Sequence, residues 1–181
     1  MGKERFLNRY RIKSARAVWH NYNAGNYFVT VCTNNREHSF GEIDNGIMKL
    51  SEIGKYLFEN LLNINSHYPY TEIPLFVVMP NHIHAIVLID DMHRRDVARN
   101  VSTNDESKNE KMVEIAKHQS LLCVTIRGIK SAVTKFANDN NIDFAWQLRF
   151  HDHVIRDQNE MNSIANYIEN NPTKWKSDCY N

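Results

Sequence analysis

Hydrophobic and polar positions follow two different periods along this chain, and each period predicts a type of element. Residues 27–33 (YFVTVCT) are rich in β-branched and aromatic side chains, which predicts a first strand. Residues 40–43 (FGEI) predict a turn region that is followed by a short extended piece. Apolar residues then recur at helical spacing, at Leu50, Ile53, Leu57, Leu61 and Ile64. This stripe predicts an amphipathic helix over about residues 50–65 that faces a core.

Two apolar runs follow that helix and flank a corner at Pro80-Asn81. Residues 75–79 (LFVVM) and 82–89 (HIHAIVLI) predict adjacent strands joined at this corner, because proline cannot donate a hydrogen bond to a strand ladder. Residues 90–118 are polar and charged with little periodicity, which predicts a surface loop inserted between ordered elements.

The last third of the chain predicts two helices with a strand between them. Helical spacing returns over residues 120–138, and residues 149–155 (RFHDHVI) are typical of a strand. Asp157 and Glu160 form a capping-box pattern that starts a final helix over QNEMNSIANYIEN. Pro172 ends this helix, since the residue before a proline resists helical geometry.

The composition is that of an ordinary globular protein. With 181 residues, 42% of them hydrophobic and 24% charged, residues 1–181 are expected to form a single domain with a sizeable core. Three cysteines that form no CxxC pair and no disulfide framework favour a reducing cytoplasm. No apolar run approaches the roughly 20 residues that cross a bilayer, and the basic N-terminus lacks the apolar core of a signal peptide. We therefore expect a cytoplasmic protein with no membrane partner.

The net charge is only +1, so a nucleic-acid partner must be sought in where the charges lie. Residues 1–22 form a basic segment with aromatic residues near its cations, which suits phosphate contacts and base stacking on single-stranded DNA. Its cations are Lys3, Arg5, Arg9, Arg11, Lys13 and Arg16. Arg127 and Lys130 give the predicted 120–138 helix a basic face that could run along a DNA backbone. A solvated tail and a solvated helix face would explain the same two patterns.

His82 and His84 bracket one apolar residue in the second of the paired apolar runs. Side chains two residues apart on a strand share a face at a separation of roughly 6–7 Å, so both imidazoles are expected to point into the same space. Two neutral imidazoles can hold one divalent cation if further ligands arrive from elsewhere in the fold. A pair of surface or hydrogen-bonded histidines would explain the same spacing.

The combination of MPNHIH with a downstream YIENNP resembles the single-tyrosine HUH transposases of bacterial insertion sequences, and more closely their REP-associated tyrosine transposase relatives. The resemblance covers most of the chain. Its blocks occur in the order of the family: YFVTVCT, FGEI, VVMPNHIHAIVLI, IRGIKSAVTKFAN, WQLRFHDHVIRD and YIENNPTKW. The two motifs are specific in combination, although neither suffices alone.

The resemblance implies a fold and the residues that carry a reaction. The fold is α+β, a ferredoxin-like antiparallel sheet with helices packed on it. His82 and His84 match the metal ligands of the family, and Tyr167 matches the nucleophile. Asn171 falls where insertion-sequence relatives carry a glutamine that completes the metal shell, a departure that leaves its ligand role open.

The implied reaction is metal-dependent cleavage and transfer of single-stranded or hairpin DNA. Tyrosine has an ordinary pKa of about 10, so the phosphate must be polarised, and a divalent cation, Mg²⁺ or Mn²⁺, would do this. Attack by Tyr167 would leave a covalent 5′-phosphotyrosine and a free 3′-hydroxyl without any need for ATP. Some relatives are dimers that complete each site with the partner's tyrosine helix, and others need not be, so a homodimer and a monomer are both open.

Two other functions account for parts of the pattern. A metal-dependent hydrolase that uses water as the nucleophile would recruit His151 and His153 as extra metal ligands. The sequence has no HExxH helix, however, and no carboxylate clearly placed as a base. A domesticated DNA-binding protein would keep the fold and lose transposition, although the intact histidine pair and Tyr167 argue against lost chemistry.

Overall fold

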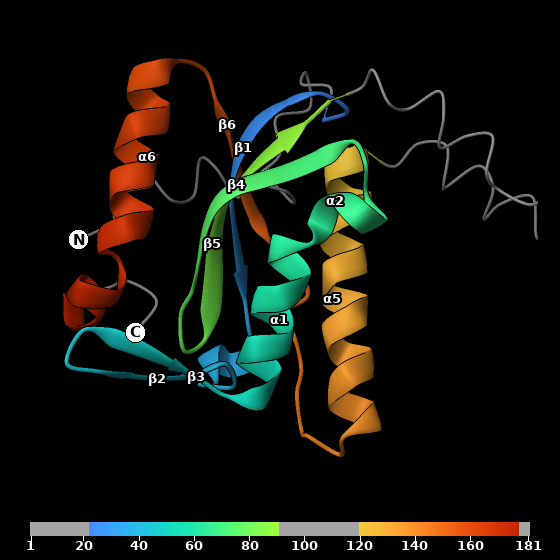
Figure 1. Cartoon of the computed structure of the whole chain (residues 1–181), viewed down its shortest axis with the longest axis vertical. Helices are drawn as coiled ribbons and strands as arrows, with labels where there is room; N and C mark the ends of the chain where they lie inside the picture. The colour runs from blue at the N-terminus through green and yellow to red at the C-terminus, as the bar shows by residue number, and fades with distance from the viewer. Residues whose placement is uncertain (1–21, 91–119, 178–181) are drawn as a thin grey trace, which may run out of the picture.

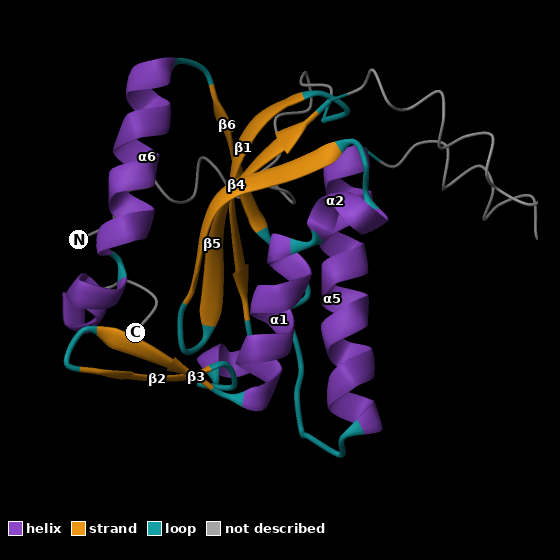
Figure 2. Cartoon of the chain, viewed as in Figure 1, coloured by secondary structure: helices purple, strands orange, loops and turns teal. Residues whose placement is uncertain are grey.

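The order of the strands in one antiparallel sheet defines the fold. The computed structural model describes residues 22–90 and 120–177, so nearly all of the basic segment 1–22 and of the 90–118 insertion lies outside the described residues. The sheet has the order β4-β5-β1-β6, where β1 is Gly25–Cys32, β4 is Thr71–Val78, β5 is His82–Ile89 and β6 is His151–Ile155. This order and the helical crossovers confirm the predicted α+β, ferredoxin-like architecture (Figure 1; Figure 2).

Helices cover both faces of this sheet and are divided unequally between them. The helices α1 (Glu52–Leu62), α2 (Ile64–His67) and α5 (Leu121–Asp139) lie on one face, while α6 (Gln158–Asn170) lies on the other (Figure 1). A separate hairpin of β2 (Gly41–Asp44) and β3 (Ile47–Leu50) and the 3-10 helices η1 (Asn34–Arg36) and η3 (Pro172–Ser177) complete the described part. No helix in these residues is long and apolar enough to cross a membrane.

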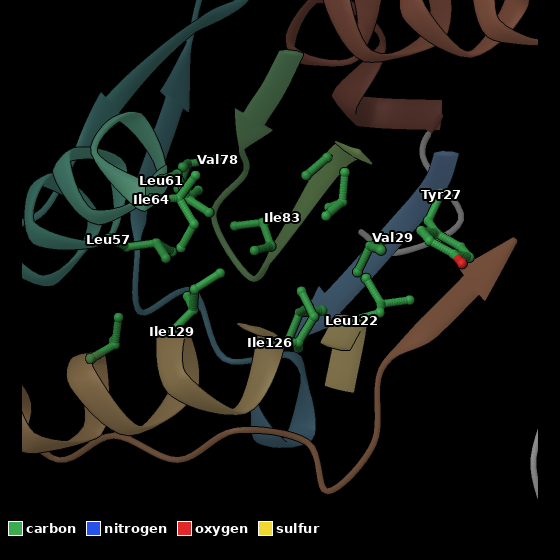
Figure 3. Packing of buried hydrophobic residues seen from close by; sticks show 14 of the residues in the cluster. Tyr27, Val29, Leu57, Leu61, Ile64, Val78, Ile83, Leu122, Ile126 and Ile129 are labelled. Carbon is green, nitrogen blue, oxygen red and sulfur yellow. The ribbon is translucent and has the colours of Figure 1, made fainter. Parts of the chain in front are cut away.

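The main hydrophobic core lies between the sheet and the α1/α5 layer. Figure 3 shows Ile83 of β5 among apolar side chains from β1, α1 and α5, including Leu122. A smaller cluster under α6 joins Ile86, Ile155 and Ile168. Strands β1 and β5 are therefore packed on both faces, which makes them a rigid platform for a functional site.

Side-chain caps start two helices where the sequence pattern places them. Ser120 Oγ accepts a hydrogen bond from the backbone N–H of Cys123 (3.3 Å) at the start of α5, and Asp157 Oδ1 accepts one from the N–H of Glu160 (2.9 Å) at the start of α6. Each cap typically contributes about 1 kcal/mol. The helices predicted over 120–138 and 158–170 are confirmed to within one residue at each end. The strand predicted over 149–155 starts later, at His151.

Two local predictions were wrong. Residues 40–43 are not a turn, since Gly41–Asp44 is strand β2 and the turn follows at Asn45-Gly46. Both turn residues have positive φ (52° and 77°), as a tight two-residue hairpin requires. The single helix predicted over 50–65 is interrupted at Asn63, whose ψ of 21° separates α1 from α2.

Candidate active site

Strand β5 places His82 and His84 on the sheet face that α6 covers. In the register, His84 lies opposite Thr30 of β1, and Ile86 lies opposite Phe28. Ile86 belongs to the cluster that packs against α6. His82 and His84 are 0% and 1% exposed, and their ring centroids are 4.5 Å apart. The predicted same-face pair is present, and both of its rings are buried rather than at the surface.

His84 is held between Thr30 and Tyr167. Its Nδ1 lies 2.8 Å from Thr30 Oγ1 within the sheet, and its Nε2 lies 3.1 Å from the Tyr167 hydroxyl. The Phe28 ring stacks on the imidazole at 5.2 Å and meets the Tyr167 ring edge-on at 6.1 Å. Tyr167 is 42% exposed, so a side chain that is anchored at His84 can also meet a large substrate.

Asn81 orients the second imidazole. Its Oδ1 accepts a hydrogen bond from His82 Nδ1 (2.7 Å), and the amide cannot be reversed because its Nδ2 donates to the Arg36 carbonyl (3.3 Å). His82 is therefore the Nδ1–H tautomer, in which Nε2 carries the lone pair. Burial, with a smaller contribution from the Arg36 charge, lowers the pKa of His82 to about 3, so the ring is neutral at physiological pH.

The donor atoms at this site suit a divalent cation. Both Nδ1 atoms are engaged by neighbours, so a ligand bond from either ring would come from Nε2, which in His84 also contacts the Tyr167 hydroxyl. Asn171 follows Tyr167 by one helical turn and is 2% exposed, and its buried Oδ1 has no hydrogen-bond partner among the described residues. A buried amide oxygen in that state costs about 1–3 kcal/mol, which a bound cation would offset. Imidazole nitrogens and amide oxygens are donor types that divalent cations accept.

Comparison with known proteins identifies a relative and a fold. A Haemophilus influenzae Rd protein described as uncharacterized is 33% identical over 168 residues, which cover 92% of this chain and 91% of that protein. The chain belongs to the same family as that protein. No protein-family model matches the sequence.

Comparison with solved structures identifies a protein with the same fold. It is a REP-associated tyrosine transposase bound to a REP hairpin, and it matches with a TM-score of 0.55 at 21% identity, over 88% of this chain and 73% of that one. The chain has the REP-associated tyrosine transposase fold. The resemblance read from MPNHIH and YIENNP is thereby confirmed at the level of the fold.

On this transposase fold, His153 of β6 pairs with a carboxylate of α6 rather than with the buried histidines. His153 Nε2 lies 2.6 Å from Glu160 Oε1, and the other oxygen of Glu160 accepts a hydrogen bond from the Arg156 N–H (2.8 Å). These contacts, the Arg156 bond first, lower the pKa of the Glu160 carboxyl. Within residues 22–90 and 120–177, no three His, Cys, Asp or Glu side chains gather as a metal-binding group. The described residues therefore do not form the four-histidine site of the hydrolase alternative.

Of the cations expected to bind DNA, the two that the structure describes do not border the histidine pair. Arg127 and Lys130 lie on α5, across the sheet from α6 (Figure 1). Lys130 Nζ donates to the Gln147 carbonyl (2.6 Å) and lies 5.7 Å from the Trp146 ring centroid, and burial lowers the pKa of its ammonium. The predicted N-terminal contacts lie outside the described residues; they are Arg5, Arg9, Arg11, Lys13 and Arg16.

Sequence reasoning missed three residues around the site. Phe28 and Thr30 are two residues apart on a strand that was predicted, so they share one of its faces. Only the register shows that this is the face of His84. Trp175 comes from η3, where its ring centroid lies 6.0 Å from that of His82 and 5.6 Å from that of His38. No local pattern in the sequence points to Trp175.

Proposed function

We propose that this protein is a metal-dependent transposase that cleaves and rejoins single-stranded or hairpin DNA through Tyr167. The observation that carries the proposal is the 3.1 Å contact between the Tyr167 hydroxyl and His84 Nε2, beside a second buried imidazole. A side chain that can form a covalent link to DNA thus lies next to donor atoms that can hold a metal. The fold shared with a hairpin-bound transposase supports the same function.

In the proposed first step, the Tyr167 hydroxyl oxygen attacks the scissile phosphorus. The new bond replaces the bond from phosphorus to the 3′-oxygen; the phenol loses its proton, and the 3′-oxygen gains one. The products are a 5′-phosphotyrosine and a free 3′-hydroxyl, so the phosphodiester energy is retained in the covalent link. Attack of a 3′-hydroxyl on the phosphotyrosine reverses the step and completes strand transfer.

Neighbouring side chains hold Tyr167 and the two imidazoles in a fixed orientation before the substrate binds. Phe28 and His84 restrain the Tyr167 ring, so little rotational freedom remains to be lost when the phosphate arrives. Thr30 and Asn81 engage the Nδ1 atoms of the two imidazoles and hold each ring in its orientation.

The histidine pair and the tyrosine come from one chain. A divalent cation held by His82, His84 and Asn171, Mg²⁺ or Mn²⁺, would offset the negative charge that develops on the phosphate. The contact between His84 and Tyr167 of the same molecule supports a site completed within one chain, and the homodimer that exchanges tyrosine helices is the alternative.

Trapping of the covalent intermediate tests the proposal. Tyr167→Phe removes only a hydroxyl, so a loss of activity can be assigned to chemistry rather than to packing. With metal and labelled hairpin DNA from the flanks of its own gene, the wild type should form a protein–DNA adduct that survives boiling in detergent. Tyr167→Phe should form none and still bind DNA. Tyr56→Phe is the matched control, because Tyr56 stacks on Phe136 in the α1/α5 layer, and it should behave like the wild type.

Two results would replace the proposal. Cleavage by Tyr167→Phe at near wild-type rate, with release of a free 5′-phosphate, would indicate a hydrolase that uses water. DNA binding by the wild type without cleavage in Mg²⁺ or Mn²⁺ would indicate a domesticated DNA-binding protein.

A further inference from the structure

A groove of about 880 Å³ lies between α5 and the segment 146–150. One wall is the helix face that carries Arg127, and the other is the segment 146–150 that leads into β6. We call this feature the α5 groove. Helix α5 lies across the sheet from α6, which covers the histidine pair (Figure 1), and the groove volume is in the range that accommodates a ligand of nucleotide size or larger.

Positive charge dominates the described lining of the α5 groove. Its described lining residues include one acid, Asp139, and four cations: Arg127, Lys130, Lys135 and Arg149. Lys135 forms an ion pair with Asp139, so the acid offsets the charge of its own neighbour on the helix. The excess of positive charge complements a phosphate backbone and disfavours a cationic ligand.

The segment 146–150 adds an apolar wall beside these charges. Leu148 is 97% exposed, and Phe150 of the same wall is partly buried. Apolar and aromatic side chains next to cations suit the faces of unpaired bases, which stack on such surfaces while the backbone follows the charge. A duplex hides its base faces in the stack, so this lining favours single-stranded over double-stranded nucleic acid.

Hydrogen bonds between the two walls of the α5 groove fix the position of one wall relative to the other. Lys130 Nζ donates to the Gln147 carbonyl (2.6 Å), and Trp146 Nε1 donates to the Lys130 carbonyl (3.1 Å). The Trp146 ring also packs on Phe40 at 5.3 Å, which anchors the segment to the core. A preformed surface loses little conformational entropy on binding.

The same segment connects the groove to the active-site face. It runs into β6, an edge strand whose first residue, His151, lies opposite Thr30 in the register. Directly opposed residues share a sheet face, and Thr30 contacts His84. His151 therefore lies on the same sheet face as the histidine pair, at the edge strand. Strand β6 is two strand spacings, roughly 10 Å, from β5, which a single DNA strand passing the sheet edge can cover.

The geometry points to a second nucleic-acid site: the α5 groove binds single-stranded DNA that flanks the cleaved phosphate, after the strand has passed the β6 edge. This inference rests on the proposed function, because it assigns the groove to the same substrate. Its consequence is that affinity depends on the length of DNA beyond the active site.

Length-dependent binding tests the groove separately from catalysis. Variants are made in the Tyr167→Phe background, and fluorescence anisotropy compares a short strand confined to the cleavage site with strands extended on the 5′ or the 3′ side by about 15 nucleotides. One extension should raise affinity. Arg127→Glu and Arg149→Glu should each reduce that gain by roughly threefold to tenfold and lower the salt slope by about one, without changing affinity for the short strand.

Two further variants exclude general effects of charge and folding. Lys55→Glu on α1 makes the same change in net charge away from the groove lining, and it should leave the gain intact. Arg127→Gln removes the charge without adding repulsion, and it should reduce the gain by less than Arg127→Glu while its melting temperature stays at that of the parent.

The outcomes separate the groove from the catalytic proposal. A gain on extension that Arg127→Glu and Arg149→Glu leave unchanged would overturn the inference, and so would the absence of any gain or a gain seen only with duplex extensions. Failure of the proposed function looks different, because the wild type would then form no covalent adduct whatever the groove variants do.

Discussion

The two faces of the central sheet use the same strands for different purposes. On the α1/α5 face, Val29 of β1 and Ile83 of β5 are apolar and join the main core. On the α6 face, the next residues along these strands, Thr30 and His84, are polar and equally buried. Adjacent residues of a strand therefore have different roles: one packs in the hydrophobic core, and the next contributes a polar side chain to the candidate site.

This difference shows how a small domain can keep a buried polar site. Buried polar groups cost free energy unless they are hydrogen-bonded, and the Thr30–His84 and Asn81–His82 pairs meet that requirement. The large apolar cluster on the opposite face supplies the stability that holds the strands in register. Substitutions at neighbouring positions should therefore change stability and activity separately.

The largest expected effect comes from opening a cavity on the core face. Ile83→Ala should lower the free energy of unfolding by about 2–5 kcal/mol, because the surrounding side chains relax only partly into the space. His84→Gln, one residue along, should abolish adduct formation with a much smaller loss of stability. Urea unfolding and the adduct assay on both variants check this. Equal losses of stability would show that the two faces are not separable.

A smaller effect is expected from the polar support of the site. Thr30→Val keeps the side-chain shape and removes the partner of His84 Nδ1, so affinity for Mn²⁺ measured by titration calorimetry should fall about 10–100-fold. Thr125→Val is the matched control, because its buried hydroxyl pairs with Thr71 at 2.9 Å on the opposite face. It should cost about 1 kcal/mol of stability and leave metal affinity unchanged. Similar affinities for both variants would mean that Thr30 does not position His84.

The smallest expected effect, about 1.4 kcal/mol for one pH unit of acidification below pH 6.5, is a pH dependence of stability that arises at His82. Burial lowers its pKa from 6.5 to about 3, so the unfolded chain binds the proton more readily than the folded one. The stability associated with the neutral ring is complete above about pH 6.5 and is lost as the pH falls toward 3, by about 1.4 kcal/mol per pH unit. His82→Gln cannot titrate and should lose less stability on acidification. Urea unfolding of both proteins with a chelator, at neutral and mildly acidic pH, checks this; parallel losses would contradict it.

Local signals predicted most of the elements, and the failures have local reasons. Helices α5 and α6 were located closely because their caps and their 3.6-residue period are properties of adjacent residues. Strand β2 was taken for a turn because its sequence, GEID, contains a glycine and two acidic residues, which are depleted in strands. The Asn45-Gly46 dipeptide was the signal that could have located this hairpin.

By itself, the sequence determined that His82 and His84 share one face of a strand, because the two-residue period of a strand is a local property. It also determined, through MPNHIH and YIENNP, which fold to expect. Only the tertiary structure decided that Tyr167, 83 residues beyond His84, contacts it, that Thr30 and Phe28 support the contact, and that the basic face of α5 lies across the sheet. Such contacts depend on strand register and on helix packing between distant segments, which no local pattern specifies.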